Sequence, residues 1–283
     1  MKNILALKGG GIRGVYQARI LQDLEQRTGK PIAKQFDLIA STSAGCINAC
    51  ALSLGIPARD IITLYRERGG LIFDFGGFGI GTLVAKHSAA GIESVLREAF
   101  GSATFSDSPV KLIGCIWNYT REQPKTVKSW ADPEGWYMWE VARASSAAPT
   151  YFPPFEKGDE AFIDGGVASN DPSMWALAEA RQLWPNEEVH LTTVGTGYRT
   201  DRRKAPWGGG ILPWMPHIIE TIMDGNQANV PYQCRALLGR HFTHIDTALP
   251  GYVAKRMDCA SRGNINALVQ LAEEHLQSLR LAG

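Results

Sequence analysis

The sequence lacks three features that would each place it in another class of protein: a long apolar run, paired cysteines and an excess of charge of one sign. No stretch reaches the roughly 18 consecutive apolar residues of a membrane span. The five cysteines are odd in number and lie mostly among apolar neighbours, which favours buried free thiols over a disulfide framework. The net charge of +1 gives no electrostatic basis for nucleic acid as a partner.

The sequence shows no pattern typical of a linker, a repeat or a targeting segment. No Pro/Ser-rich stretch or block of like charges divides the 283 residues, so we expect a single domain over residues 1–283. The apolar start at 1–7 is too short for a signal peptide, which favours a cytoplasmic protein. Cys46 and Cys50 are four residues apart, but no nearby histidine completes a metal-binding set, so we expect no metal or other cofactor.

What the sequence does contain is a serine motif between a strand pattern and a helix pattern. An apolar run at 36–40 precedes Ser-Thr-Ser-Ala-Gly at 41–45, and an apolar segment follows at 46–54. A serine flanked by small residues at a strand-to-helix junction is typical of a nucleophile elbow. The motif predicts that Ser43 holds its hydroxyl at the carboxyl end of the strand, beside the first N–H groups of the helix. An ordinary serine N-cap would also fit these residues.

A glycine-rich loop comes earlier in the chain. Gly9, Gly10 and Gly11 follow a strand pattern at 4–7 and precede a helix that we expect from about residue 15 to 27. Consecutive glycines let several backbone N–H groups point toward one place, which suits an oxyanion as well as a phosphate.

With Gly14, the loop matches the spacing of a dinucleotide-binding fingerprint. That site also needs an acidic residue at the end of the second strand, where this chain has Ser-Thr-Ser at 41–43. We therefore interpret the loop as an oxyanion site. Because the ends of neighbouring parallel strands share one edge of a sheet, the loop and Ser43 should face the same crevice.

A third motif is Asp164, which ends a strand pattern at 161–164 and is followed by two glycines. The glycines leave one side of the carboxylate open, although Asp-Gly-Gly is also common in plain turns. The small-residue segment at 140–148, which ends at Pro149, is predicted to be a helix that packs close to the elbow.

These motifs together resemble the patatin-like phospholipases. The resemblance rests on Gly-Gly-Gly-Ile-Arg-Gly at 9–14, the serine motif at 41–45, Asp-Gly-Gly at 164–166, and the runs at 145–153 and 194–197. It covers residues 3–200 well and the remainder weakly. It implies an α/β, patatin-type three-layer fold with a central, mostly parallel sheet flanked by helices, and membrane phospholipid as the substrate.

In that family the serine is the nucleophile, the aspartate is its base and the glycine loop forms the oxyanion hole. The resemblance therefore implies Ser43 and Asp164 as the catalytic pair, and it assigns the oxyanion hole to Gly9, Gly10, Gly11 and Arg13. Arg13 would support the loop.

Two positions depart from the family pattern. Lys8 replaces the acidic or small residue often seen before the glycines, and Ser41 replaces the first glycine of the elbow. The histidines offer a rival base, but none follows a strand and precedes glycines as Asp164 does. We interpret His241 and His244 as ordinary hydrogen-bonded histidines.

A weaker resemblance leads to bacterial patatin-like effectors of anti-phage defence. It rests on Tyr-Gln-Ala at 16–18, on the compact length, and on Leu-Leu-Gly-Arg at 237–240 near Asp246. It implies a cyclic dinucleotide activator, a homo-oligomer and peripheral contact with the inner face of the membrane. Two apolar, glycine-rich segments at 71–81 and 207–216 are predicted to be flaps over the crevice.

Two functions of other kinds stay open at this point. One is a catalytically idle nucleotide-binding signalling module that uses the glycine loop for phosphate. The other is a soluble carboxylesterase or thioesterase with no role at membranes.

Overall fold

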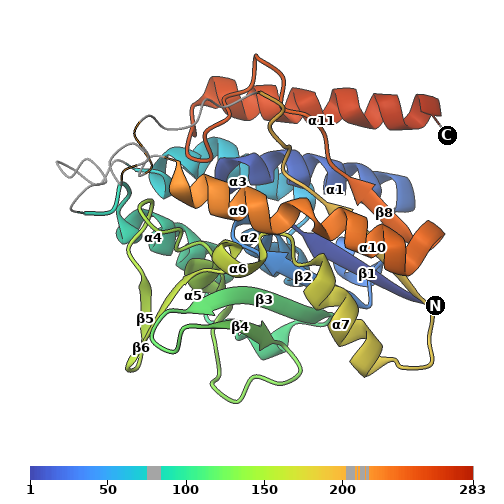
Figure 1. Cartoon of the computed structure of the whole chain (residues 1–283), viewed down its shortest axis with the longest axis horizontal. Coiled ribbons are helices and arrows are strands. Elements are labelled where there is room, and N and C mark those ends of the chain that lie inside the picture. Colours follow the sequence, from blue (N-terminus) through green and yellow to red (C-terminus); the bar gives the residue numbers. More distant parts are fainter. Residues whose placement is uncertain (75–83, 202–207, 209, 211–213, 215–216, 283) are drawn as a thin grey trace.

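In the computed structural model, the described residues are 1–74, 84–201, 208, 210, 214 and 217–282. They form an eight-stranded sheet in which β5-β6-β3-β2-β1-β7-β8 lie in this order and β4 also pairs with β3 (Figure 1). The strands are β1 Lys2–Leu7, β2 Leu38–Thr42, β3 Lys111–Asn118, β4 Gln123–Lys128, β5 Phe155–Lys157, β6 Glu160–Asp164, β7 Val189–Val194 and β8 Phe242–Ile245.

The centre of the sheet is parallel and one side of it is antiparallel. β1 runs parallel to β2 and β7, β2 parallel to β3, and β7 parallel to β8. β4, β5 and β6 enter through antiparallel pairs. The predicted α/β class with a central, mostly parallel sheet is confirmed.

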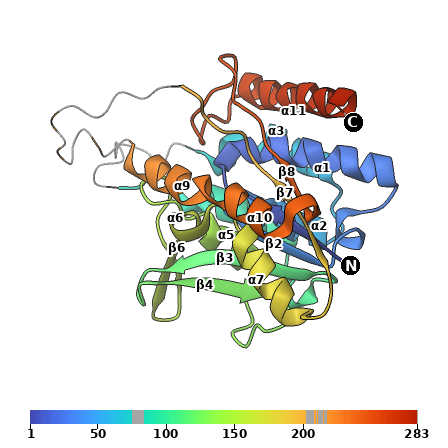
Figure 2. The same cartoon turned by 45° about the vertical axis from the view of Figure 1, so that its right-hand side comes forward.

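Helices cover both faces of this sheet. They are α1 Gly14–Thr28, α2 Ala44–Ser53, α3 Ala58–Ile72, α4 Ala89–Phe100, α5 Met138–Ser145, α6 Gly166–Ser169, α7 Ser173–Leu183, α9 Ile218–Ala228, α10 Val230–Leu238 and α11 Arg262–Ala282, with short 3-10 turns η1 Gly11–Arg13, η2 Ile32–Lys34, η3 Phe105–Asp107 and η4 Gly239–His241. In both views of the whole chain, α11 lies beside α1 (Figures 1 and 2).

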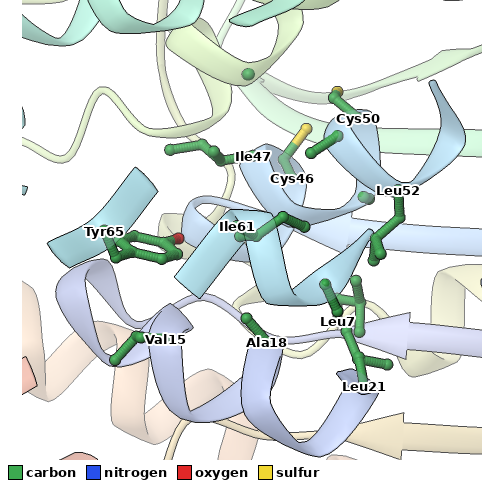
Figure 3. Packing of buried hydrophobic residues seen from close by; sticks show 14 of the residues in the cluster. Leu7, Val15, Ala18, Leu21, Cys46, Ile47, Cys50, Leu52, Ile61 and Tyr65 are labelled. Carbon is green, nitrogen blue, oxygen red and sulfur yellow. The ribbon is translucent and has the colours of Figure 1, made fainter. Parts of the chain in front are cut away.

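The alternation of side chains along β1 divides the core between the two faces. Leu5 and Leu7 belong to the larger apolar cluster, which α1 to α5 and α11 complete. Ile4 and Ala6 belong to the cluster under α7 and α10. A strand that is buried on both sides has no polar face, which explains its continuous apolar pattern. Figure 3 shows part of the larger cluster, where side chains of α1, α2 and α3 meet.

The sequence predicts the helix from residue 58 to end at Arg68, before two glycines, and this is wrong. α3 continues to Ile72. Gly69 is buried in the helix, where an added Cβ would lie 3.2 Å from Cδ1 of Ile12. Glycine here permits close packing between α3 and η1, and it does not end the helix.

The sequence favours a helix over 217–238 with a break at Pro231, but in the structure the segment divides at Asn229, between α9 and α10. Pro231 lies in the first turn of α10, where its missing N–H costs no helical hydrogen bond. Residues 75–83 and most of 207–216 lie outside the described residues, so the two flaps stay predictions, as does the single domain. None of the helices in the part of the chain that the structure describes is both long and apolar enough to cross a bilayer.

Candidate active site

Ser43 occupies a strained turn between β2 and α2. Its backbone has φ 54° and ψ −127°, which an L-residue rarely adopts. The Ser43 N–H donates to Oγ of Ser145 at 2.8 Å, and that hydroxyl donates to the carbonyl of Cys115 at 2.7 Å. An added Cβ at Gly45 would clash with the carbonyl of Leu7, so this position requires glycine. The geometry is that of the predicted elbow.

Ser41 fits in the place of the usual glycine because its side chain turns away from the crevice. It is fully buried, and its hydroxyl donates to the carbonyl of Ile113 on the neighbouring strand at 2.9 Å. The hydroxyl therefore ties β2 to β3 and leaves the space beside Ser43 free.

The arrangement of strands on β3 brings Asp164 to Ser43. β4 covers one edge of β3 over residues 113–118, so β2 and β6 share the other edge. β2 pairs with it up to Thr42 opposite Cys115. The last residue of β6, Asp164, lies opposite the next residue of β3, Ile116. Asp164 therefore lies just beyond the point where β2 turns into the elbow.

The two side chains are in direct contact. Ser43 Oγ donates a hydrogen bond of 2.7 Å to Oδ2 of Asp164. The other carboxylate oxygen, Oδ1, accepts the backbone N–H of Gly166 at 2.7 Å. An added Cβ at Gly165 would clash with the carbonyl of Cys115. The first glycine thus lets β6 approach β3, and the second supplies an N–H that orients the carboxylate.

The Asp164 carboxylate is fully buried, and this changes its acidity. Burial raises the pKa of Asp164 from its ordinary value of 3.8 to about 7, against the hydrogen bonds from Gly166 and Ser43, which lower it. A carboxylate with a pKa near neutrality can accept a proton from a hydroxyl and return it at physiological pH.

The histidines lie away from this pair. His87 contacts Asp258, His190 contacts Thr243, His275 contacts Tyr16, and His244 lies 3.9 Å from Asp246. Among the described residues, no histidine lines the pocket that contains Ser43.

The glycine loop presents two of its N–H groups to the site. Gly9 donates to the carbonyl of Asn170 at 3.0 Å, so its N–H is not free to bind an oxyanion. In the part of the chain that the structure describes, the N–H groups of Gly10 and Gly11 have no acceptor, and both residues line the pocket with Ser43. Both N–H groups are therefore free to bind an oxyanion.

Contacts on each side leave no room for larger residues in the loop. An added Cβ at Gly10 would clash with Thr196, and one at Gly11 would clash with the carbonyl of Met257. Gly11 also has φ 59°, in the left-handed region that favours glycine.

Arg13 contacts the backbone of the glycine loop. Its guanidinium is buried and donates through Nε to the carbonyl of Gly10 at 3.3 Å and through Nη1 to that of Gly197 at 3.4 Å. Burial lowers the pKa of Arg13, against the nearby charges of Asp224 and Glu220. Because the Gly10 carbonyl is bound on this side, the Gly11 N–H, which belongs to the same trans peptide, points to the other.

The pocket above Ser43 and Asp164 is mostly apolar. Its walls include Ile47, Tyr65, Ile72, Phe73, Ile92 and Phe152. Such a lining suits a hydrocarbon chain that ends in a reacting carbonyl. Among the described residues, no group of three or more histidine, cysteine or acidic side chains could hold a metal ion.

Sequence reasoning missed two residues that shape the site. Ser145 binds the N–H of Ser43, and Asn170 binds the N–H of Gly9. Ser145 lies in the small-residue run that carries part of the resemblance, which was the available signal. Asn170 lies just before α7, and nothing local in the sequence indicates that its carbonyl faces the glycine loop.

The chain is similar in sequence to several known proteins. A family model described as patatin-like phospholipase matches residues 5–177. A cGAMP-activated phospholipase of Pseudomonas aeruginosa is 32% identical over 94% of this chain and 84% of that protein. Calcium-independent phospholipase A2-gamma of Rattus norvegicus is 30% identical over 80% of this chain, which spans only 32% of that protein. Patatin group M-3 of Solanum tuberosum is 25% identical over 98% of this chain and 84% of that protein.

Proposed function

This chain belongs to the patatin-like phospholipase family, and from that premise we propose that it releases fatty acids from membrane phospholipids through Ser43 and Asp164. The observation that carries the proposal is the 2.7 Å hydrogen bond from Ser43 Oγ to Asp164. It lies at the floor of an apolar pocket and beside the free N–H groups of Gly10 and Gly11.

The mechanism follows from these contacts. Ser43 Oγ attacks the ester carbonyl and its proton passes to Asp164, while the N–H groups of Gly10 and Gly11 stabilise the negative charge on the carbonyl oxygen. The alcohol leaves with the proton that Asp164 returns, and an acyl ester remains on Ser43. Asp164 then takes a proton from water, whose oxygen attacks the acyl ester. The fatty acid departs and the proton returns to Ser43.

A short soluble ester tests the catalytic pair without any requirement for a membrane. Ser43→Ala and Asp164→Ala should each lower kcat by about 10⁴-fold or more, and the double variant should be little worse because the two residues act as a unit. Ser53→Ala is a matched control, since Ser53 is a buried serine at the far end of α2. Its hydroxyl donates to the carbonyl of Cys50 in the same helix. It should keep native activity.

Substantial turnover by Asp164→Ala would place the base elsewhere. If nucleotide binding depended on Gly10 and Gly11 while no ester was cleaved by the native protein, the nucleotide-binding module would be the better account.

We also propose that a cyclic dinucleotide activates the enzyme. The active enzyme would be a homo-oligomer that binds peripherally at the inner face of the membrane. The support is the extended similarity to the cGAMP-activated relative, which covers nearly the whole of this chain. Acyl release from phospholipid vesicles should rise on addition of cGAMP, with AMP as the control. Light scattering should show a larger species in the same samples. An unchanged rate with every cyclic dinucleotide tested would remove this part of the proposal.

A further inference from the structure

A buried lysine lies directly before the glycine loop. Lys8 is only 4% exposed, and its ammonium lies 3.3 Å from a carboxylate oxygen of Asp171 and 3.3 Å from one of Asp246. Both carboxylates are buried too. Asp171 comes just before α7 and Asp246 just after β8, so the lysine joins two segments that are distant in sequence.

Asp246 holds a segment that binds the loop. Its carboxylate packs against Gly195 and accepts the N–H of Gly197 at 2.8 Å. The carbonyl of Gly197 in turn accepts Arg13, which binds the Gly10 carbonyl, and the hydroxyl of Thr196 donates to the Gly9 carbonyl at 2.9 Å. Two of the contacts that orient the loop therefore depend on the segment that Asp246 holds.

Asp171 holds the other flank. Its Oδ1 accepts the N–H and the hydroxyl of Ser173, which fixes the start of α7. The preceding residue, Asn170, accepts the Gly9 N–H through its backbone carbonyl. Fixing Asp171 thus fixes the carbonyl that binds the loop from this side.

We propose that Lys8 is a positioning residue for hydrolysis: by joining Asp171 and Asp246, it sets the distance between the two segments that orient the N–H groups of Gly10 and Gly11. The inference rests on the proposed function. The same role explains why a lysine can replace the acidic or small residue of the family pattern: the carboxylates of Asp171 and Asp246 neutralise its buried charge.

The energetics of buried ion pairs favour this role over a purely stabilising one. Burial lowers the pKa of Lys8, but the charges of Asp171 and Asp246 outweigh burial and raise it above its ordinary value, so Lys8 stays charged. Buried pairs of this kind contribute little net stability compared with apolar residues of the same size, whereas removal of one partner alone leaves an unpaired buried charge. What the cluster adds is a fixed geometry.

The test compares two folded proteins of equal charge at this cluster. Lys8→Met alone would leave two facing carboxylates, so it is combined with Asp246→Asn, which removes one charge of each sign and keeps an acceptor for Gly197 N–H. Lys2→Met is the control, because Lys2 lies at the opposite end of β1 and pairs with Asp37 near the surface. Each variant is assayed on a soluble ester and titrated with a trifluoromethyl ketone, which forms a tetrahedral adduct on a catalytic serine.

In the Lys8→Met/Asp246→Asn variant we expect kcat to fall by about 10- to 100-fold, with KM within about twofold of the native value. The reason is that an oxyanion donor stabilises the transition state more than the bound substrate, so its displacement chiefly raises the activation barrier. Affinity for the ketone should fall by the same factor as kcat, and Lys2→Met should match the native enzyme. A folded double variant with native kcat and native ketone affinity would overturn the proposal.

If the double variant does not fold, the single variant Asp246→Asn tests the proposal instead. It keeps the Lys8–Asp171 pair and an acceptor for Gly197, and it should lose kcat in the same direction by a smaller factor. Native kcat in this variant would also overturn the proposal. Failure of the proposed function itself would be seen separately, as a native protein that cleaves no ester.

Discussion

Two residues of the site have features that are rare in proteins: Ser43 has a strained backbone, and Asp164 has a buried carboxylate. Ser43 keeps a positive φ because the chain on both sides of it is fixed, by β2 and by the first turn of α2. Asp164 keeps a carboxylate without solvent because Ser43 and Gly166 bind its two oxygens. Backbone strain and a buried carboxylate are both unfavourable for folding, but they give Ser43 and Asp164 the reactivity that the site needs.

The raised pKa of Asp164 makes hydrolysis sensitive to pH near neutrality. As general base, Asp164 must be deprotonated in the free enzyme, so kcat/KM on a soluble ester should fall as the pH drops through about 7, by roughly tenfold per pH unit below it. A profile that stays flat down to pH 5 would contradict this. The control is Ser53→Ala, which should give the native profile.

The same pKa predicts how stability depends on pH. Because the folded-state pKa of Asp164 lies above its ordinary value of 3.8, its contribution to stability is fully present below about pH 4 and is lost as the pH rises through about 7. Asp164→Asn, which removes the buried charge, should therefore be more stable than the native protein at pH 8, by on the order of a few kcal/mol, and should lose that advantage by pH 4. Urea unfolding at both pH values measures the difference; an equal difference at both would contradict the assignment.

At the scale of elements, the site depends on where strands end along a shared edge. β1, β2 and β7 finish level with one another, since Leu7 pairs with both Ser41 and Val194. The loop after β1 and the elbow after β2 are therefore neighbours. β6 completes the site because it pairs with β3 directly after the last β3 residue that pairs with β2, which places Asp164 beside Ser43.

Gly10 gives a prediction about the fit between the loop and its neighbours. Gly10→Ala adds a methyl group that would clash with Thr196, so the loop must shift and its N–H groups with it. We expect kcat to fall by about 10²-fold or more with a modest change in KM, as for loss of an oxyanion donor. Gly225→Ala is the matched control: Gly225 lies in α9, and nothing lies within 4 Å of an added Cβ. A Gly10→Ala variant with native kcat would remove Gly10 from the oxyanion hole.

Local patterns predicted most of these elements but not how they meet. Strand and helix patterns placed β1, β2, α2 and β6 because each carries its own apolar run and its own turn residues. The end of α3 was missed because the packing of Gly69 against Ile12 is a contact between segments distant in sequence. For the same reason, sequence could name Ser43 and Asp164 through a resemblance but could not give the pKa of Asp164 or the use of Gly9 N–H by Asn170.

At the scale of the whole molecule, one sheet separates two apolar clusters and presents the site at its carboxyl edge. Open parallel sheets commonly bind ligands in this position. The pocket above the site is walled by residues of α2, α3 and α4 together with Tyr151 and Phe152, so the larger cluster both stabilises the fold and lines the space for an acyl chain.

Acyl release from phospholipid vesicles tests the central claim most directly. The native protein, with cGAMP present, should release free fatty acid and leave lysophospholipid, as measured by mass spectrometry. Ser43→Ala should release none, and Ser53→Ala should match the native rate. Cleavage of a short ester without any acyl release from vesicles, or equal release by Ser43→Ala, would contradict the claim that this chain hydrolyses membrane phospholipid through Ser43 and Asp164.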